Sequence, residues 1–379
     1  MLMNMRFTAL RLPFLLIALA LFGILHSEED LSSEQSEEEV MFNQLETRLG
    51  KLEKQERYGT KYNPGAAKSY GLVLGADALY WQARENGIPY AVAVNDPLQE
   101  FLPSPDFVLK SHVKEFDFDW DFGVRVHGGL QFHRDDWRIL GTWTHFDTKA
   151  QDHGFTTSNT GFQPIWSDPL FLEPAGFASH VKAKWKLFMN QVDLMLSRAF
   201  YTGRYFVLEP AVGLSGVWID QHLRSRSKVA IFPGFSRVKL ENEFKGIGLR
   251  GGLNTRFCIK HGFSIFNTTH LGLYYGQFEL ERKEKFFSNS FFILSGKNSM
   301  EDKFRQITSL IAMQMGIGWD YGFRNNRCGL SVKLAYEYQI FFAQNQFMRV
   351  IKVEPLPEVL KNQGDLALMG GTLSVLFTF

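Results

Sequence analysis

The sequence predicts an all-β protein, namely a transmembrane antiparallel β-barrel of about ten strands, with twelve as the alternative. Three observations support this fold class. Apolar and polar residues alternate with a period of two from Tyr70 onward, no later apolar stretch reaches the roughly 18 residues of a spanning helix, and the 379 residues include 36 Phe and 33 Gly. Only helices and closed barrels pair every backbone polar group in lipid, so a membrane protein built from this chain must be a barrel.

Charge and cysteine content argue against several functional classes. Lys and Arg (41) balance Asp and Glu (40), so the bulk charge gives no case for binding nucleic acid or another polyanion. Cys258 and Cys328 are too few for a disulfide scaffold and lack the spacing of a metal site. We expect buried thiols, with a bridge between subunits as the alternative in an oxidising compartment. We expect no metal and no cofactor.

Residues 1–27 have the pattern of a signal peptide. Arg6 and Arg11 precede an apolar run over residues 12–25, and an acidic segment follows. Charged, apolar and polar regions in this order predict export, with cleavage after Ser27. A retained membrane anchor is the weaker alternative, because the run is short for a bilayer.

Residues 28–57 are expected to form a periplasmic amphipathic helix or a short coiled coil. Apolar residues recur there at three- and four-residue steps, namely at Phe42, Leu45, Leu49 and Leu52. Two heptads do not decide between a helix that packs on another element and a self-associating coiled coil. Residues 58–69, which include Pro64, are expected to be a linker. The barrel domain is then 70–379.

The clearest expected strand covers residues 120–133. Its even positions carry apolar residues such as Trp120 and Val124, and its odd positions carry polar ones such as Asp121 and Arg125. The segment exceeds the roughly 9 to 11 residues that cross a bilayer at a barrel tilt, which favours a membrane barrel over a soluble sandwich. The other expected strands are 244–259, 306–321 and 330–340, which alternate regularly, and 70–83, 137–148, 181–200, 205–220, 263–280 and 365–379, which are less regular.

Short and long connections alternate between these strands. The short ones are expected at 133–136, 201–204, 260–262 and 323–327, and the long ones at about 84–116, 149–179, 221–242, 281–304 and 341–364. Tight periplasmic turns and long external loops are typical of outer-membrane barrels, so we expect both termini in the periplasm. Two further strands could lie in the long connections, for example at 106–118 or 228–245.

The chain ends on an alternating aromatic strand. Its apolar positions are Leu373, Val375, Phe377 and Phe379. A terminal aromatic residue on a last strand is common in outer-membrane barrels, where the assembly machinery recognises it. We therefore expect that machinery and outer-membrane lipid as partners, no nucleic acid, and leave a homo-oligomer open.

Four segments carry a family resemblance, namely 76–83 (ADALYWQA), 190–194 (NQVDL), 212–220 (VGLSGVWID) and 246–254 (GIGLRGGLN). Together they resemble the Legionella-type major outer membrane protein family of pore-forming barrels, which also occurs in chlamydia-related bacteria. The resemblance covers roughly residues 70–379. It implies a porin-like channel in a bacterial outer membrane and carries no site residues across.

The leading functional hypothesis is passive diffusion of small hydrophilic solutes and ions through the lumen. Placing the polar side of each strand inward gives these lumen residues: Asp77, Asp121, Arg125, Lys182, Lys184, Lys186, Arg250, Arg256, Asp320, Lys333 and Glu337. Cations prevail in that set, so we predict a mild anion preference. The alternative is a closed lumen, because small barrels are filled by their own side chains.

Two other functions are alternatives to a pore. A non-conducting structural or adhesive barrel would act through its long external loops. An enzyme is not expected: His133, Asp135 and Asp136 are the most suggestive group, but they lie in an expected periplasmic turn, and no recognisable catalytic set occurs elsewhere.

Overall fold

The computed structural model describes residues 46, 70–95, 111–132, 136–156, 160–169, 177–202, 205–229, 234–289, 293–323, 328–352 and 358–379. The expected signal peptide (1–27) and linker (58–69) lie outside these residues. So does the expected helix or coiled coil (28–57), apart from Glu46, which is helical. Among the described residues, no helix is long and apolar enough to cross a membrane.

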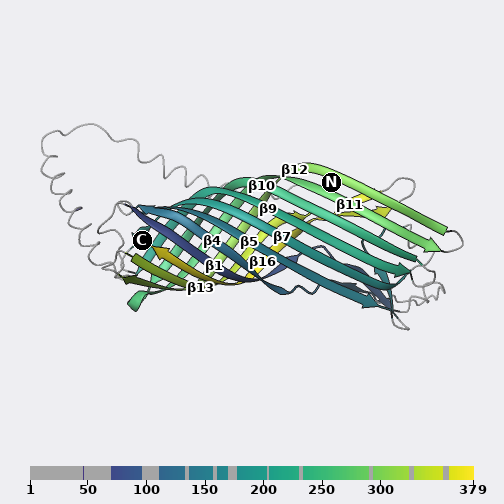
Figure 1. The fold of residues 1–379 in the computed structure, drawn as a ribbon, viewed down its shortest axis with the longest axis horizontal. Coiled ribbons are helices and arrows are strands. Elements are labelled where there is room, and N and C mark those ends of the chain that lie inside the picture. The colour runs from purple at the N-terminus through teal and green to yellow at the C-terminus, as the bar shows by residue number, and fades with distance from the viewer. Residues whose placement is uncertain are drawn as a thin grey trace, which may run out of the picture. The chain divides into compact units, whose positions relative to one another are not determined.

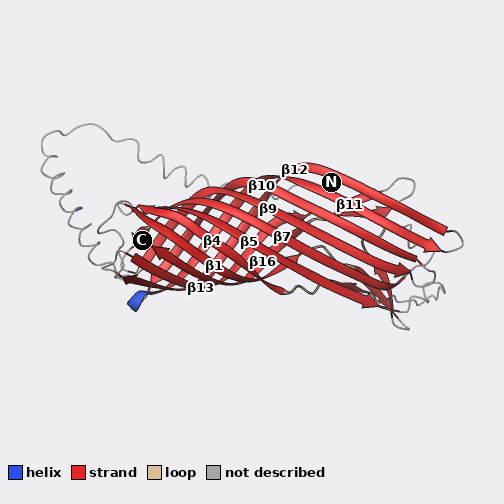
Figure 2. Ribbon diagram, viewed as in Figure 1, coloured by secondary structure: helices blue, strands red, loops and turns tan. Residues whose placement is uncertain are grey.

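Ten antiparallel strands close into a barrel (Figures 1 and 2). They are β1 (Tyr70–Glu85), β4 (Trp120–Phe132), β5 (Trp137–Phe155), β7 (Ala178–Arg198), β9 (Phe206–Val229), β10 (Gly234–Cys258), β11 (Phe263–Asn289), β12 (Ile293–Phe323), β13 (Cys328–Asn345) and β16 (Gly364–Thr378). Each pairs with the next, and β1 pairs with β16, so no barrel edge is left open. The predicted strand count and fold class are confirmed.

The two suggested extra strands are not barrel members. The described residues of 228–245 belong to β9 and β10, which are paired in register as far as Lys228 and Phe235. Within 106–118, the structure describes only the short strand β3 (Ser111–Lys114). It pairs with β2 (Ala91–Asn95), which pairs with β6 (Thr160–Pro164) beside β7. Three further short strands are β8 (Phe200–Thr202), β14 (Met348–Lys352) and β15 (Glu358–Lys361).

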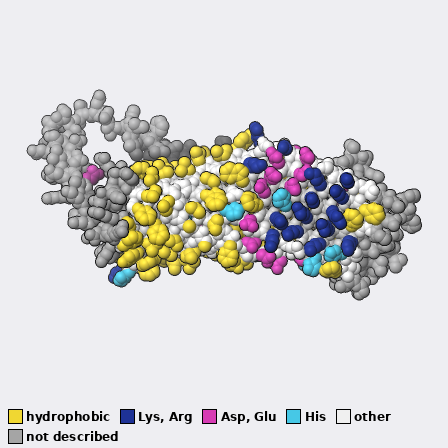
Figure 3. Space-filling view, in the orientation of Figure 1, with side chains coloured by type: hydrophobic (Ala, Val, Ile, Leu, Met, Phe, Trp, Pro, Cys, Tyr) yellow, Lys and Arg dark blue, Asp and Glu magenta, His cyan; other side chains and the backbone are white. Residues whose placement is uncertain are grey.

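The outward face of the barrel is divided into two zones along its length (Figure 3). In the first, the apolar band, large apolar side chains are exposed, such as Phe122, Leu249 and Ile317. The second, called the extension below, consists of the strand parts beyond this band, at 146–155, 178–187, 219–229, 234–244, 276–289 and 293–306. Its outward face is charged. Exposed apolar side chains suit lipid and exposed charges suit water, so the band is the membrane-crossing zone.

The expected assembly signal lies in the band. Leu373, Phe377 and Phe379 are exposed, and Val375 lies on the same outward face of β16. The rings of Phe377 and Phe379 lie 6.4 Å apart. Their recognition by assembly machinery stays a prediction.

Glycines on the barrel wall make room for inward aromatic rings. A Cβ at Gly276 of β11 would lie 2.5 Å from Cζ of Phe244, whose ring packs against Phe278 with centroids 4.6 Å apart. At Gly371 of β16, by contrast, a Cβ would meet no atom within 4 Å. Glycine at 276 is therefore required by the close approach of the Phe244 ring.

Gly276→Ala should destabilise the refolded barrel by about 1–3 kcal/mol, because the added methyl group displaces the Phe244 ring. Urea unfolding followed by tryptophan fluorescence measures this. Gly371→Ala is the matched control and should stay within about 0.5 kcal/mol of the wild type. Equal losses in the two variants would contradict the steric explanation.

Candidate functional site in the barrel lumen

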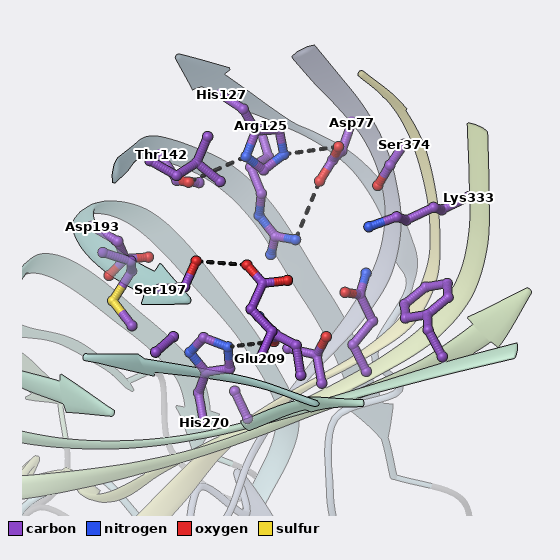
Figure 4. Close-up of a pocket in the computed structure, with 18 of the residues that line it drawn as sticks. Asp77, Arg125, His127, Thr142, Asp193, Ser197, Glu209, His270, Lys333 and Ser374 are labelled. Carbon is purple, nitrogen blue, oxygen red and sulfur yellow. Dashed lines mark hydrogen bonds and ion pairs between the residues drawn. The ribbon is translucent and has the colours of Figure 1, made fainter. Parts of the chain in front are cut away.

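The membrane-level lumen holds a network of charged side chains (Figure 4). They come from strands all round the barrel because the alternation of each strand turns its polar positions inward. Of the residues predicted to face the lumen, eight do so: Asp77, Asp121, Arg125, Arg250, Arg256, Asp320, Lys333 and Glu337. Their placement agrees with the sequence, while their role in a pore stays a prediction.

Arg125 of β4 is the centre of the largest cluster. Its guanidinium donates to both carboxylate oxygens of Glu337, at 2.8 and 3.0 Å, and to Asp77 at 3.4 Å. Nε of Arg125 also donates to Thr144 at 3.0 Å. Nε2 of His127 lies 2.9 Å from the other Asp77 oxygen. These contacts join β1, β4, β5 and β13, and the two carboxylates are almost fully buried.

Three more ion pairs extend the network. Arg250 binds Asp193 at 2.7 Å, Arg256 lies 3.3 Å from Asp320, and Arg138 lies 3.5 Å from Glu209. The candidate set from the sequence omitted Asp193, Glu209 and Arg138. Alternation with apolar neighbours could have found Asp193, which lies between Val192 and Leu194 within a segment of the family resemblance.

A cavity of about 210 Å³ lies among these side chains. Lys333 of β13 lines it and lies over the Phe266 ring, with its ammonium 5.2 Å from the ring centroid. No acidic partner of Lys333 is found in the described part of the chain. His270 also lines the cavity and contacts Asn254 at 3.3 Å. The cavity is polar and large enough to hold several waters or a small polar solute.

Lys182, Lys184 and Lys186 do not face the lumen, so the prediction was wrong for them. They alternate with Val181, Ala183, Trp185 and Leu187, which are buried on the inward face of β7, whereas the three lysines lie on the outward face. The sequence reasoning assumed that polar residues point inward along a whole strand. This part of β7 belongs to the extension, where the outward face meets water and the inward face is a protein core.

Without these lysines, the predicted lumen set contains four cations (Arg125, Arg250, Arg256, Lys333) and four anions (Asp77, Asp121, Asp320, Glu337). The excess of positive charge behind the predicted anion preference is therefore gone.

The lumen beside the extension is filled by an inner apolar layer. Within the described residues, every barrel strand except β4 contributes to it. Its largest members on the barrel strands are Trp81, Phe146, Trp185, Phe244, Tyr274, Phe278 and Phe341, none more than 1% exposed. Side chains that lined an open water-filled channel would keep a larger exposed fraction. At this level, the described side chains pack against one another across the lumen.

Segments between the strands complete the inner apolar layer. Phe118, just before β4, packs edge-on against Trp185 with ring centroids 5.4 Å apart, and its carbonyl accepts from Gln82. Trp166, which follows β6, is fully buried and donates from its ring to the Pro89 carbonyl at 2.8 Å. Phe118 thus contacts both β7 and β1, whereas Trp166 is held beside the segment that follows β1.

A buried ion pair in the extension anchors the segment around Trp166. Arg282 donates to the Trp166 carbonyl at 3.1 Å and pairs with Glu284, and both side chains are buried. Glu284 accepts from the Asp168 backbone amide at 3.1 Å and from Ser236 at 2.7 Å. Desolvation raises the pKa of Glu284, and the nearby charge of Arg282 opposes this shift. A buried pair with such partners fixes a position more than it adds stability.

The two cysteines are free and buried near the short-turn end of the barrel, Cys258 at the end of β10 and Cys328 at the start of β13. Of the suggested catalytic group, His133 and Asp135 lie outside the described residues, while Asp136 is described and has φ of 54°.

Arg125→Leu should destabilise the barrel by about 3–5 kcal/mol, because it leaves Asp77 and Glu337 buried without their cation. Adding Asp77→Asn and Glu337→Gln should restore part of the loss. Urea midpoints of the refolded proteins provide the measurement. The control is Lys333→Met, because Lys333 is a lumen cation that is not paired with a carboxylate as Arg125 is with Glu337. A loss as large for Lys333→Met would show that Arg125 has no special structural role.

Comparison with known proteins gives one family and several distant structures. A family model described as "Legionella pneumophila major outer membrane protein precursor" matches residues 62–379. No curated protein sequence matches the chain. Among solved structures, the chain is similar to the outer membrane protease OmpT from Escherichia coli, with 9% identity and a TM-score of 0.32 over 83% of this chain and 99% of that one.

Two other solved structures show comparable similarity. A major outer membrane protein from Thermus thermophilus has 10% identity and a TM-score of 0.29, over 82% of this chain and 100% of that one. The Pseudomonas putida toluene transporter TodX has 9% identity and a TM-score of 0.30, over 85% and 96%. Similarity at this level carries no argument about what the chain does.

Proposed function

Because the chain belongs to the Legionella pneumophila major outer membrane protein family, we propose that it is a surface protein of a bacterial outer membrane that acts through its extension. In this proposal, the barrel anchors the extension in the membrane, and its lumen is closed to free diffusion. The proposal assigns the chain no catalytic activity. It corresponds to the structural or adhesive alternative rather than to an open porin.

The inner apolar layer carries this proposal. A diffusion pore needs a continuous hydrated path, and the nearly complete burial of Trp81, Phe146 and Trp185 supports a lumen without such a path at their level. The ion-paired network closer to the short turns fills much of the remaining lumen. Ten-stranded barrels are narrow enough for side chains to fill them in this way.

Planar-bilayer recording tests the closed lumen. The refolded wild type should give no stable conductance steps. A variant with Trp81→Gly, Phe118→Gly and Trp185→Gly should give steps, because it removes aromatic side chains from the inner apolar layer, and those steps would demonstrate insertion. Stable steps from the wild type itself would overturn the closed-lumen proposal.

A passive diffusion pore is the second candidate, favoured by the polar cavity beside Lys333. It requires the segments that carry Phe118 and Trp166 to move away from the lumen. In that open state, Lys333 is the one cation of the predicted set that faces the lumen and has no acidic partner among the described residues, so a mild anion preference would depend on it. The reversal potential of a conducting wild type in a salt gradient would measure this preference.

We also propose that the extension and the long connections face the outside of the cell, with the short turns and both termini in the periplasm. The band lies nearer the short turns, which is typical of barrels with tight periplasmic turns. In a background with both native cysteines replaced by alanine, Ser299→Cys should react with a membrane-impermeant maleimide on intact cells. Lys260→Cys, in a short turn, should react only after permeabilisation. The reverse pattern would invert the orientation.

A further inference from the structure

Two rows of cations cross the outward face of the extension at right angles to the strands. Direct cross-strand neighbours in the outer row are Lys182, Arg226, Arg237, Lys285 and Lys297, from β7 to β12. The inner row, two residues closer to the apolar band, is Lys184, Arg224, Lys239 and Lys283. We call these the basic rows. Figure 3 shows that Lys and Arg side chains gather densely on the outward face of the extension.

These rows place like charges where a sheet is least able to tolerate them. Side chains directly opposite on neighbouring strands have Cβ atoms about 5 Å apart, and like charges there are destabilising. Lys283 pairs with Glu281, but no other member of the basic rows has an ion pair with a described residue. Desolvation, followed by the charges of Lys186, Lys149 and Arg224, lowers the pKa of Lys184. A surface on which acidic residues alternate with these cations would be equally soluble and would lack this repulsion.

The shape of the array indicates the kind of anion that it fits. Neighbouring strands lie about 4.8 Å apart, so the outer row extends over about 19 Å, and the two rows are about 7 Å apart. Apart from the half-buried Lys184, its side chains are exposed on a sheet face rather than gathered in a cavity. A small anion needs converging donors, whereas an extended polymer can contact many separate cations at once.

The position of the rows argues against lipid headgroups as the ligand. Two acidic rows lie between the basic rows and the apolar band, namely Glu241, Glu281 and Glu301, and then Asp220, Glu243 and Glu279. From Tyr275, at the edge of the band, to Lys283 is about 27 Å along the strand, or about 20 Å along the barrel axis at a tilt of about 40°. The polar headgroup layer is only about 5–8 Å thick. Headgroup phosphates would therefore meet Lys245 and Arg305, and then the acidic rows, before they could reach the basic rows.

Nearby aromatic side chains argue against single-stranded nucleic acid. Binding of such strands uses separate aromatic platforms for successive bases. Beside the outer row, Phe235 and Phe287 stack on each other with centroids 6.0 Å apart, and Arg237 covers the Phe235 ring at 4.8 Å. These rings are already engaged with protein groups.

We propose that the basic rows bind a linear, densely sulfated polysaccharide outside the cell. The close spacing of the cations suits a chain with several sulfates per repeat better than one with widely spaced carboxylates. This inference rests on the proposed function for its place on the cell surface, and it names the ligand class through which the extension would act. The binding chemistry itself requires neither a closed lumen nor a particular orientation.

Heparin binding by the full-length protein, refolded in zwitterionic micelles, tests the proposal. The wild type should bind heparin with an affinity that falls as salt concentration rises. Replacing Arg226, Arg237, Lys285 and Lys297 by Ser should weaken binding by about tenfold or more. The matched control replaces Lys245, Lys260, Lys303 and Arg305 by Ser, removes the same net charge and should change affinity less than about twofold.

Several results would overturn the proposal. Equal losses in the two variants would mean that net charge alone drives binding. Equally tight binding of single-stranded DNA, or of a carboxylate-only polysaccharide, would reject the assigned ligand class, and absence of heparin binding would reject it outright. If the outer-row variant fails to fold, Arg224→Ser with Lys239→Ser tests the inner row in the same assay. Absence of heparin binding would not contradict the proposed function. Likewise, stable conductance steps from the wild type would not contradict an observed binding of heparin.

Discussion

One constraint organises this barrel: each long strand passes from lipid into water without losing its two-residue alternation. Because a register slip would turn every side chain to the opposite face, the strand must change its residue types instead. On β11, the outward positions change from Leu271 and Leu273 in the apolar band to Lys283 and Lys285 in the extension. The inward positions change in the opposite sense, from His270 to Phe278. The charged lumen, the inner apolar layer and the charged outer face all follow from this exchange.

The sequence was sufficient to predict those features that depend on alternation within the band. All ten strands were predicted there, because a lipid-facing side leaves a clear apolar period on each of them. The prediction was wrong where the surroundings change, since alternation alone does not say which face meets water. Residues 181–187 illustrate this: the same pattern of Lys with Val, Ala, Trp and Leu fits either orientation. The suggested separate strand at 228–245 was wrong for a related reason. Its described residues extend β9 and β10 beyond the length needed to cross a bilayer.

The pairings in the lumen could not have been predicted from one strand at a time. Arg125 reaches Glu337, which is 212 residues away in sequence, only because β1 closes the barrel between β4 and β16 and brings β13 near. Buried carboxylates are costly without a cation, so this closure and the ion pairs support each other. The same closure brings residues of the connecting segments, such as Phe118 and Trp166, against the inner wall. Their approach depends on contacts of high sequence separation that leave no periodic signal.

Although the net charge of the chain is near zero, positive and negative charges are separated along the extension. The resulting repulsion among the cations must be offset by other interactions. The outer row has four adjacent cation pairs and the inner row has three, so the seven pairs together oppose folding by up to several kcal/mol. Directly beneath them, inward residues of the same strands include Trp185, Leu223, Val238 and Leu240, all buried. Burial of each large apolar side chain contributes about 1.5–3 kcal/mol, which is enough to offset the repulsion. The inner apolar layer thus has two consequences: it fills the lumen, and it supports an outer face that would otherwise be too strongly charged to fold.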